Sequence, residues 1–510
     1  MTNTNTNTKT PIDSCLSTRS GHLFIEDCDA VDLAERFGTP VFVLSENQIR
    51  RNVRSFKTAF ERGWPDGPVK VMPAAKANWI SAVQMILADE GCGCDIYSPG
   101  ELDVALRAGF DPRYISVNGV PKEKDHIARS IKEGVRITID SLEEVDMIEQ
   151  AAAELNMTAH VRLRLKPVLE TFIRHSDFVA EGLVPADLAA LAYKGGLVFE
   201  QVMAVAPRLM QMENIELVGF HQHHGRHHAS LAYWEAQMKA FAFEMGRVCQ
   251  ALGGFQPKEI DIGGGFAVPR DPFNAATHYS DPIQLAALHG ISKGLSLMGP
   301  ANRYKVLSKL IDALLVSHPN KKMAPAIDAY GATCTRTLRS ELPKHNIDTK
   351  GLMLQLEPGR ALHGNTGIHL TRVRAIKRMT APIKWHLIVV DTTEFWFTGG
   401  RYEHHLHDYR FANKTDAPMT GKADIIGRSC YGDRLMPAVP VPDVSVGDLL
   451  AMLDTGAYQE VSMSNFNAIP RPATILVTGG NAHVIRRAER LEEVFQRDEV
   501  PAHLASKKAL

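Results

Sequence analysis

Apolar residues recur along the chain in short segments that are separated by stretches with a helical spacing. Between residues 69 and 357, eight apolar segments have the length and composition of buried strands. The stretches between them place apolar residues at i, i+3 and i+4, and several begin at Ser or Pro with acidic residues in the first turn. The predicted strands are Val69–Ala75, Cys94–Ser98, Tyr114–Asn118, Val135–Asp140, Ala159–Leu165, Ile215–His223, Glu259–Ile262 and Leu352–Glu357. The predicted helices include Ile80–Glu90, Gly100–Ala108, Lys122–Glu133 and Ser141–Leu155.

This alternation predicts an α/β protein with a (β/α)8 TIM barrel, which needs eight such units over roughly 250 residues or more. An open, doubly wound sheet uses the same alternation and is the alternative. The excess length falls between the seventh and eighth strands, where we expect an insertion at about residues 267–349 with a helical run over 304–317. We place the barrel at residues 46–366.

From residue 367 onward the sequence consists of short segments in which apolar and polar residues alternate, separated by Pro and Gly. This pattern predicts an all-β domain. Similar segments near the front, Gly21–Asp27 and Pro40–Leu44, are expected to pair into the same sheet. We therefore assign residues 19–45 and 367–490 to a β-sandwich or β-barrel domain, with a disordered tail at 1–18 and a C-terminal tail at 491–510. The C-terminal segments are His369–Ile376, Trp385–Asp391, Asp448–Leu453 and Ala473–Thr478.

Composition narrows the class of partner. The 57 basic and 58 acidic residues nearly balance, so the chain lacks the electrostatic footprint of a protein that binds nucleic acid or an anionic membrane. No apolar run reaches the ~18 residues of a membrane span. The first residues lack the charged segment followed by an apolar segment that is typical of a secretory signal. The 7 cysteines are too scattered for a disulfide framework, and Cys92 and Cys94 are interpreted as ordinary strand cysteines and not as metal ligands. We expect a cytoplasmic protein with a small-molecule substrate.

Chemically active residues follow the predicted strands, where barrel enzymes place their reacting groups. Each of these residues alone has an ordinary structural explanation, but together at one barrel mouth they form a set: an amine, an anion nest, a flat ring, and a carboxylate followed by an arginine. The residues at the strand ends are Lys76, Asp95, Ser98, Asn118, Asp140, Arg164, His221, His223, the triplet Gly263–Gly265, Glu357 and Arg360.

The glycine triplet and Arg360 predict a phosphate site, because residues without Cβ let successive N–H groups approach an anion and a guanidinium adds a charged fork. Lys76 could then form an internal aldimine, a covalent use of lysine that burial or nearby cations favour. His223 could lie flat against a cofactor ring. Glu357 is the carboxylate that would keep a pyridine nitrogen protonated, and a protonated ring accepts the electron pair released by decarboxylation. An arginine in its place would suit a racemase.

The chain resembles the fold-type III pyridoxal-phosphate decarboxylases, the family of diaminopimelate, ornithine and arginine decarboxylases, and it is most similar to the diaminopimelate branch. The resemblance covers about residues 21–484 and implies an alanine-racemase-like barrel with a β domain. It rests on nine motifs in order: GTPVFVLSENQIRRN (Gly38–Asn52), AAKAN (Ala74–Asn78), CDIYSPGEL (Cys94–Leu102), RLKP (Arg164–Pro167), HQHHG (His221–Gly225), DIGGGF (Asp261–Phe266), EPGR (Glu357–Arg360), GRSCYGD (Gly427–Asp433) and DTGAYQ (Asp454–Gln459).

The resemblance implies roles residue by residue. Lys76 would be the Schiff-base lysine for pyridoxal 5'-phosphate, His223 the ring-stacking histidine and Glu357 the partner of the pyridine nitrogen. The phosphate would be held by Gly264, Gly265, Arg360 and Tyr458, and the ring-side network would include Asp95 and Arg164. Cys430 and Asp433 match a pair that one subunit of the family inserts into its neighbour's active site, with the cysteine as proton donor. A homodimer with shared active sites follows from this similarity.

Several positions depart from the family pattern and bear on substrate identity. Arg226 replaces a serine, Lys166 replaces an asparagine, and the spacing from Cys430 to Asp433 is one residue shorter than in the family. Tyr431 stands where diaminopimelate enzymes carry a substrate-contacting glutamate. Tyr431, Asp433 and Arg401 are therefore candidate substrate-binding residues. The alternatives are an amino-acid racemase, or a decarboxylase of a D-amino acid or of a siderophore or antibiotic intermediate; a non-catalytic cofactor-binding homologue is a third.

Two histidine clusters allow other interpretations. Histidines 221, 223, 224, 227 and 228 have a spacing that is possible for a metal, but we predict none because the resemblance already gives barrel-mouth histidines a role. The second cluster, His404, His405 and His407, lies in a charged segment at residues 401–410, which we interpret as a solvated loop or a substrate-selecting loop.

Overall fold

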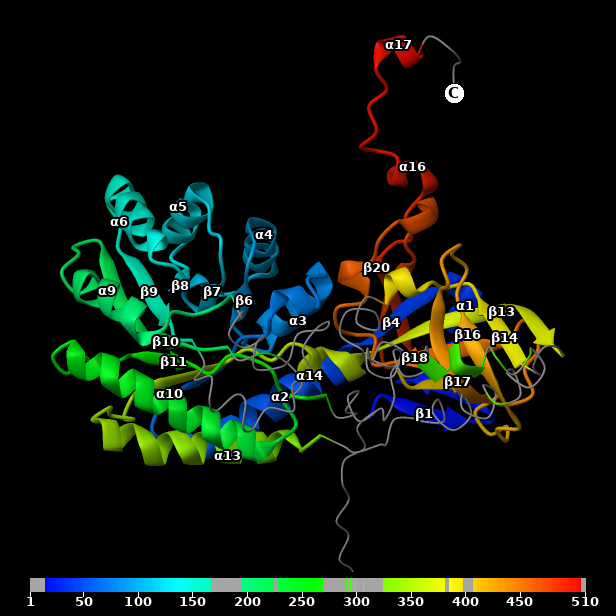
Figure 1. Ribbon diagram of the computed structural model, residues 1–510, viewed down its shortest axis with the longest axis horizontal. Helices are drawn as coiled ribbons and strands as arrows, with labels where there is room; N and C mark the ends of the chain where they lie inside the picture. Colours follow the sequence, from blue (N-terminus) through cyan, green and yellow to red (C-terminus); the bar gives the residue numbers. More distant parts are fainter. Residues whose placement is uncertain are drawn as a thin grey trace, which may run out of the picture.

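The eight predicted barrel strands all form, and they make one parallel sheet (Figure 1). The computed structural model describes residues 14–166, 194–268 and 324–505, except 224, 226, 227, 381–384 and 398–406, together with a few isolated positions between 290 and 306. The strands are β5 (Val69–Val71), β6 (Cys94–Ile96), β7 (Ile115–Val117), β8 (Arg136–Ile139), β9 (Ala159–Arg164), β10 (Ile215–His221), β11 (Glu259–Asp261) and β12 (Met353–Leu356).

The sheet closes into a barrel. Its hydrogen-bonded order runs β5-β12-β11-β10-β9-β8-β7-β6, so β5 and β6 are the two ends that must meet. They do meet, because the N–H of Gly93 donates to the carbonyl of Val71 at 2.9 Å and the N–H of Asp95 donates to that of Pro73 at 3.2 Å. The predicted TIM barrel is therefore confirmed, and the open-sheet alternative is wrong.

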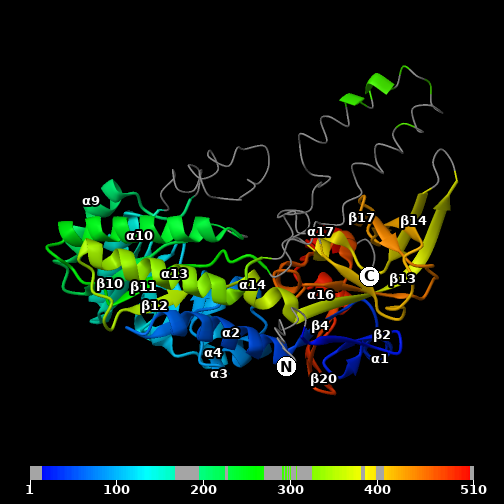
Figure 2. The ribbon, with the colours of Figure 1, turned by 90° about the horizontal axis from the view of Figure 1, so that it is seen from below.

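Helices cover the outside of the barrel and bury their apolar faces against it (Figures 1 and 2). The packing of α13 against α2 and α10 shows that the end of the expected insertion at 267–349 is an ordinary barrel helix. The insertion is therefore shorter than the sequence suggested, and its predicted helical run at 304–317 lies almost entirely outside the described residues. The helices are α2 (Glu46–Gly63), α3 (Ser81–Asp89), α4 (Pro99–Ala108), α5 (Lys124–Glu133), α6 (Glu143–Leu155), α9 (Phe199–Leu209), α10 (Leu231–Ala251), α13 (Ile327–Glu341) and α14 (Arg360–His363).

Local sequence signals fix where these helices begin and end. The hydroxyl of Ser98 accepts a hydrogen bond from the N–H of Glu101, whose side chain returns to the backbone of Ser98, so that a capping box starts α4. Pro99 occupies the first turn, and Gly109 ends the helix in the left-handed region at φ 88°. Such short, well-defined connections place the ends of the strands at one mouth of the barrel.

The second domain is mainly β, as predicted, and the front of the chain contributes to it. β4 (Val41–Ser45) is buried along its whole length and lies between β13 (Gly367–Met379), to which it is antiparallel, and β19 (Ala473–Thr478), to which it is parallel. Ser45 ends this strand and caps α2, so that the β domain leads directly into the barrel. The other strands are β14 (Trp385–Val390), β15 (Tyr409–Phe411), β16 (Gly421–Ile426), β17 (Arg434–Val441), β18 (Leu449–Leu453) and β20 (Asn481–Arg486).

The first front segment behaves differently from the expectation. Gly21–Asp27 contributes to a separate three-stranded sheet of β1 (Leu16–Arg19), β2 (His22–Ile25) and β3 (Cys28–Asp29), and not to the large sheet. The N–H of Leu23 donates to the carbonyl of Ala412 at 2.8 Å, and α1 (Ala30–Phe37) shares one hydrophobic core with this small sheet. Because β1 is an ordered strand, the boundary expected at residue 18 for a disordered tail is also wrong.

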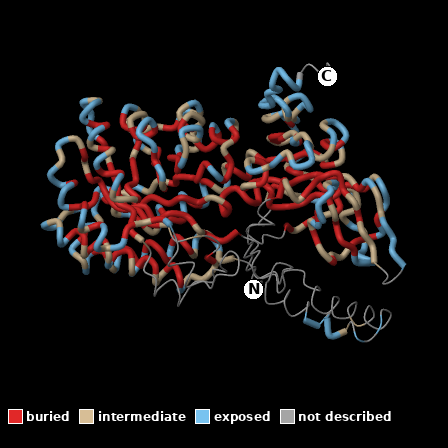
Figure 3. The backbone as a smooth tube through the Cα atoms, turned by 45° about the horizontal axis from the view of Figure 1, so that its top comes forward, coloured by how far each residue is buried: buried red, intermediate tan, exposed pale blue. Residues whose placement is uncertain are grey.

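Buried backbone runs through both domains without a break (Figure 3). One core fills the barrel and its helices, and two further cores lie in the β domain. Beyond them, α16 (Leu491–Val494) and α17 (Ala502–Ala505) extend away from the body of the molecule (Figure 1). Within the described residues, no helix is both long enough and apolar enough to pass through a membrane.

Candidate active site

A pocket opens at the carboxyl ends of the barrel strands. Lys76 enters it from a short helical turn (Ala75–Ala77) that follows β5. The structure brings together in this pocket five of the predicted site residues, Lys76, Asp95, Arg164, His223 and Glu357. The other lining residues are Ile96, Tyr97, Glu101, Asn118, Gly119, Val120, Asp140, Lys194, Gly195 and His221.

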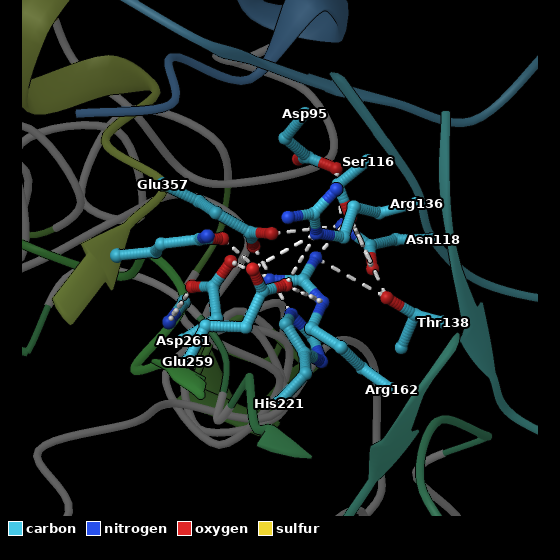
Figure 4. Close-up of polar contacts among 12 residues, drawn as sticks. Asp95, Ser116, Asn118, Arg136, Thr138, Arg162, His221, Glu259, Asp261 and Glu357 are labelled. Atoms are coloured by element: carbon cyan, nitrogen blue, oxygen red, sulfur yellow. Dashed lines mark hydrogen bonds and ion pairs between the residues drawn. The ribbon is translucent and has the colours of Figure 1, made fainter. Parts of the chain in front are cut away.

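Asn118 joins two carboxyl groups on the floor of the pocket. Its amide nitrogen Nδ2 donates to Asp95 Oδ1 at 2.6 Å and to Glu357 Oε1 at 2.8 Å (Figure 4). Burial raises the pKa of both carboxyls, and the charge of Glu357 raises the pKa of Asp95 further, while Lys76 lowers both. The pocket therefore holds an amine opposite carboxyl groups that bind protons unusually tightly.

The carboxyl of Glu357 also meets a histidine and a second acid. His221 Nε2 lies 3.3 Å from Glu357 Oε2, and a carboxylate oxygen of Asp261 lies within 4.8 Å of both residues. Burial lowers the pKa of His221 well below its ordinary value, so that the ring is neutral, and burial and Glu357 raise the pKa of Asp261 to about 6. Two buried carboxyl groups this close together disfavour the ionisation of both at once.

Arg162 lies beneath this cluster and was not identified from the sequence. Its NH1 contacts Asp261 Oδ2 at 2.9 Å, and its side chain is fully buried (Figure 4). The strand period of two residues could have found it, because Arg162 precedes Arg164 by two positions and must share its face of β9.

Arg164 is oriented by Asp140 at the next strand. Its NH1 contacts Asp140 Oδ2 at 2.7 Å, and the other oxygen of Asp140 accepts the N–H of Gly196 at 2.5 Å. A Cβ at Gly195 would lie 2.6 Å from the Arg164 guanidinium, so this glycine leaves room for the cation. The pair holds a positive charge at the side of the pocket.

The predicted glycine triplet packs tightly against neighbouring backbone. A Cβ at Gly264 would lie 2.3 Å from the carbonyl oxygen of Glu357, and Gly265 has φ 102°, a region that favours glycine. The N–H of Gly264 donates to His223 Nδ1 at 3.1 Å, which fixes the histidine beside the triplet. The segment that follows residue 268 lies outside the described residues, and so does Arg226.

Arg360 and Tyr458 lie together next to Gly359. The Arg360 guanidinium stacks over the Tyr458 ring, with Cζ 4.6 Å from its centroid. A Cβ at Gly359 would lie 2.7 Å from the Tyr458 hydroxyl, so the hydroxyl approaches the backbone where only glycine fits. The backbone segment Glu357–Arg360 connects this group to the glycine triplet, because Gly264 packs against the carbonyl of Glu357.

Seven of the predicted site residues that the structure describes do not line this pocket: Gly264, Gly265, Arg360, Tyr458, Cys430, Tyr431 and Asp433. Cys430 and Tyr431 are exposed in the loop between β16 and β17, and neither lines the pocket of the same chain. Asp433 is buried, and its carboxylate accepts hydrogen bonds from the N–H groups of Glu394 and Ser429, each at 2.6 Å, so it holds its own loop. Arg401, His404 and His405 lie outside the described residues.

The histidines of the first cluster serve different purposes. His228 is buried and stacks on Tyr233 at 3.9 Å, while His223 bonds to the glycine triplet. Donor atoms of His221, Asp261 and Glu357 lie within 4.8 Å of one another, a spacing that a metal could use. Asp261 already contacts the cation of Arg162, and Glu357 already accepts a hydrogen bond from the neutral amide of Asn118.

Comparison with known proteins finds matches to the part of the chain that contains these residues. The model of the family described as "Pyridoxal-dependent decarboxylase, pyridoxal binding domain" matches residues 46–289. A diaminopimelate decarboxylase of Actinosynnema pretiosum is 30% identical over 490 residues, with 94% of this chain and 93% of the relative covered. The chain belongs to the pyridoxal-dependent decarboxylase family. It is thus a pyridoxal-phosphate-dependent carboxy-lyase, and the predicted family, enzyme class and cofactor are confirmed.

Other relatives agree with this membership. The diaminopimelate decarboxylase of Methanothermobacter thermautotrophicus is 28% identical over 95% of this chain and 97% of its own length. The crystal structure of diaminopimelate decarboxylase from M. jannaschii has a TM-score of 0.79 and 25% identity, covering 97% of this chain and 99% of that chain. A lysine/ornithine decarboxylase from Vibrio vulnificus, at 17% identity and a TM-score of 0.65, shares the fold.

The pocket fits the family's cofactor. Pyridoxal phosphate needs an amine, an acid for its ring nitrogen and a cradle for its phosphate. Lys76 and Glu357 line one pocket, and the glycine positions that a Cβ would fill lie beside Arg360 and Tyr458. The residues of the pocket are therefore compatible with the pyridoxal phosphate that the family uses.

Proposed function

We propose that the enzyme decarboxylates an amino acid of the diaminopimelate type, with Lys76 as the residue that binds the cofactor covalently. The observation that carries the proposal is that Lys76 and Glu357 line a single pocket at the barrel mouth. The similarity in sequence and fold to diaminopimelate decarboxylases over nearly the whole chain supports the substrate class. A racemase or a non-catalytic homologue agrees less well with membership in a decarboxylase family.

The chain's own residues divide the work of binding. Lys76 would hold the cofactor through its ε-amine, and His223 would lie against the ring. Gly264, Gly265, Arg360 and Tyr458 would hold the phosphate. Asp95 and Arg164 would fix the groups beside the ring, since both are already anchored by Asn118 and Asp140.

Glu357 would keep a proton next to the ring nitrogen. When bound, pyridoxal phosphate supplies an electron sink that accepts the bonding pair as carbon dioxide leaves. Burial raises the pKa of Glu357; Oε1 accepts from Asn118 and Oε2 lies 3.3 Å from His221 Nε2, so Oε2 would be the oxygen that carries a proton. The neutral His221 ring beside Oε2 does not compete as a cation.

Cys430 of a second subunit would return a proton to the substrate carbon. Its exposure on a loop that Asp433 rigidifies supports this role, as does its hydrogen bond with Asn467, whose Nδ2 donates to Sγ at 3.1 Å. Tyr431 and Arg401 would then contact the substrate side chain, whereas Asp433, predicted from the sequence to do so, is buried with both carboxylate oxygens bonded to backbone N–H groups and would position its own loop. The assembly would be a homodimer with shared sites, and we place it in the cytoplasm.

Release of carbon dioxide from a panel of amino acids tests the function. The panel contains meso-diaminopimelate, lysine, ornithine, arginine and the D-isomers of each basic amino acid, and the product is identified by mass. We expect turnover of diaminopimelate to exceed that of the others. Preferred release from ornithine, arginine or a D-amino acid would overturn the substrate class, and loss of optical rotation without carbon dioxide would indicate a racemase.

Mixing two inactive variants tests the shared site. Lys76→Ala and Cys430→Ala each remove one half of every site in a homodimer, but a mixed dimer regains one intact site. Random exchange should restore about a quarter of the wild-type activity, because half of the dimers are mixed and each has one working site. Mixing that restores nothing, while size measurements show exchange, would place Cys430 outside the partner's site.

A further inference from the structure

The side chain of Asn467 holds Cys430 at two atoms. Its Oδ1 accepts the backbone N–H of Cys430 at 3.0 Å, and its Nδ2 donates to Cys430 Sγ at 3.1 Å. The backbone fixes which way the amide faces, because an N–H can only donate and must therefore meet Oδ1. The amide NH2 group is then left for the sulfur. Since Nδ2 cannot accept a hydrogen bond, the thiol proton must point away from the amide.

The turn that carries Asn467 has an unusual backbone. Asn467 has φ 60° and Ala468 has φ 54°, both in the left-handed region that is costly for alanine. Neighbouring contacts hold the turn, because Asn465 Nδ2 donates to the carbonyl of Ile469 at 3.1 Å and to Glu489 Oε2 at 2.6 Å. A strained turn that its surroundings keep in place is typical of functional sites.

The loop that carries Cys430 is anchored from other sides as well. Asp433 accepts the N–H of the residue before Cys430 at 2.6 Å. The Phe466 ring stacks on Phe395 with centroids 4.0 Å apart, and Phe395 meets Tyr431 edge-on at 5.9 Å. Of the 7 cysteines, Cys430 alone is exposed. The loop therefore presents one accessible thiol in a fixed position.

We propose that Asn467 is a positioning residue for Cys430, whose amide directs the thiol proton outward and then stabilises the thiolate that remains. The inference rests on the proposed role of Cys430 as proton donor, which it deepens. The proton passes from Sγ to the substrate carbon that has lost carbon dioxide, and the thiolate regains a proton from water. Because a hydrogen bond to a charged acceptor is stronger than one to a neutral acceptor, the contact with Nδ2 favours the state after the transfer.

Two substitutions separate the side chain of Asn467 from the backbone of its turn. Asn467→Gly removes both contacts and keeps a left-handed conformation that glycine adopts freely, so the chain should fold. Asn467→Asp keeps an acceptor for the N–H of Cys430 but replaces the donor to Sγ by a negative charge. The matched control is Asn156→Gly, because Asn156 is an exposed asparagine with φ 51° that ends α6 in the barrel domain.

Alkylation of Cys430 in the full-length holoenzyme tests the proposal without substrate. Iodoacetamide is added at neutral pH, and mass analysis of the peptide that contains Cys430 gives the rate constant. We expect Asn467→Gly to slow the reaction by about 2- to 5-fold, because the reacting thiolate loses a hydrogen bond. Asn467→Asp should slow it further, and Asn156→Gly should react as fast as the wild type.

The direction of the change separates positioning from a purely structural role. A contact that only held the loop would leave the rate unchanged or raise it when lost, since a looser loop exposes the thiol more. An unchanged or faster reaction in Asn467→Gly would overturn the proposal, whatever the charged variant does. A wild-type Cys430 that does not react would also overturn it, because iodoacetamide is smaller than the proposed substrate. Full carbon dioxide release by Cys430→Ala would instead contradict the proposed role of Cys430 itself, and that measurement is independent of the alkylation rates.

Discussion

At the scale of single residues, the proposed phosphate site of this decarboxylase consists of a few polar atoms beside glycines. Tyr458 reaches Gly359 with its hydroxyl and carries the Arg360 guanidinium on its ring. The side chains of Tyr458 and Arg360 do not line the pocket that Lys76 enters, although the backbone N–H of Tyr458 donates to the carbonyl of Ala77, next to Lys76, at 2.7 Å. Binding of the cofactor phosphate and chemistry at the amine should therefore respond to different substitutions.

Tyr458→Phe should weaken cofactor binding without abolishing the reaction. Losing one hydrogen bond to a charged phosphate should raise the dissociation constant of pyridoxal phosphate by about 10- to 100-fold. The ring remains to support Arg360, so kcat at saturating cofactor should change little. Fluorescence titration of the cofactor-free chain measures the binding. Tyr114→Phe, next to the amino-terminal end of β7 at the opposite face of the barrel, should change neither quantity.

At the scale of elements, an ion pair beneath the mouth connects the third and fourth helical units. Lys122 Nζ lies 3.1 Å from Glu144 Oε1, and Glu144 Oε2 accepts the N–H of Asp140, the residue that orients Arg164. Burial lowers the pKa of Lys122 and raises that of Glu144, so each group depends on the other to stay charged.

Lys122→Met should destabilise the barrel strongly. It leaves the Glu144 carboxylate buried without its cation, which costs about 3–5 kcal/mol in the free energy of unfolding. Urea denaturation measures this loss, and adding Glu144→Gln should recover part of it. Lys239→Met breaks only an exposed pair with Glu235 and should change stability by about 0.5 kcal/mol or less. Equal losses in the two variants would contradict the role of burial.

Sequence alone predicted the strands of the barrel better than it predicted the polar side chains inside it. The period of apolar residues identified every barrel strand, and it also placed Lys76, Asp95 and Glu357 at strand ends because carboxyl ends meet at one mouth. It missed Arg162, since a charge inside a strand is recognised only when its partners on other strands are known. It also included α13 in an insertion, because the packing of a helix against its neighbours is not local information.

At the scale of the whole molecule, β4 of the β domain leads directly into α2 of the barrel, and buried histidines lie near this junction. His369 on β13 and His363 in α14 are fully buried, and burial lowers their pKa values to about 3 and about 4. In the unfolded chain both would titrate near 6.5. Below that pH the unfolded state binds protons that the folded state does not.

Stability should therefore fall as the pH decreases from about 6.5 toward 4, because each buried neutral histidine contributes its stabilisation above the unfolded pKa. Each should cost up to about 1.4 kcal/mol per pH unit in this window. His369→Gln should reduce the slope of the unfolding free energy against pH, measured by denaturant titration at several pH values. His483→Gln, on the exposed side of β20, is the control that should leave the slope unchanged. A slope identical in wild type and His369→Gln would contradict this account.

The central claim is that Lys76 binds the cofactor in the pocket where Glu357 lies. Borohydride reduction of the coloured enzyme, which should absorb at about 420 nm, fixes a lysine-bound cofactor permanently. Peptide mass mapping then identifies the labelled residue. If the claim is right, the label lies on Lys76 alone, and the Lys76→Ala variant lacks the absorption band at about 420 nm. A label on another lysine, or a Lys76→Ala variant that keeps both its colour and its activity, would contradict it.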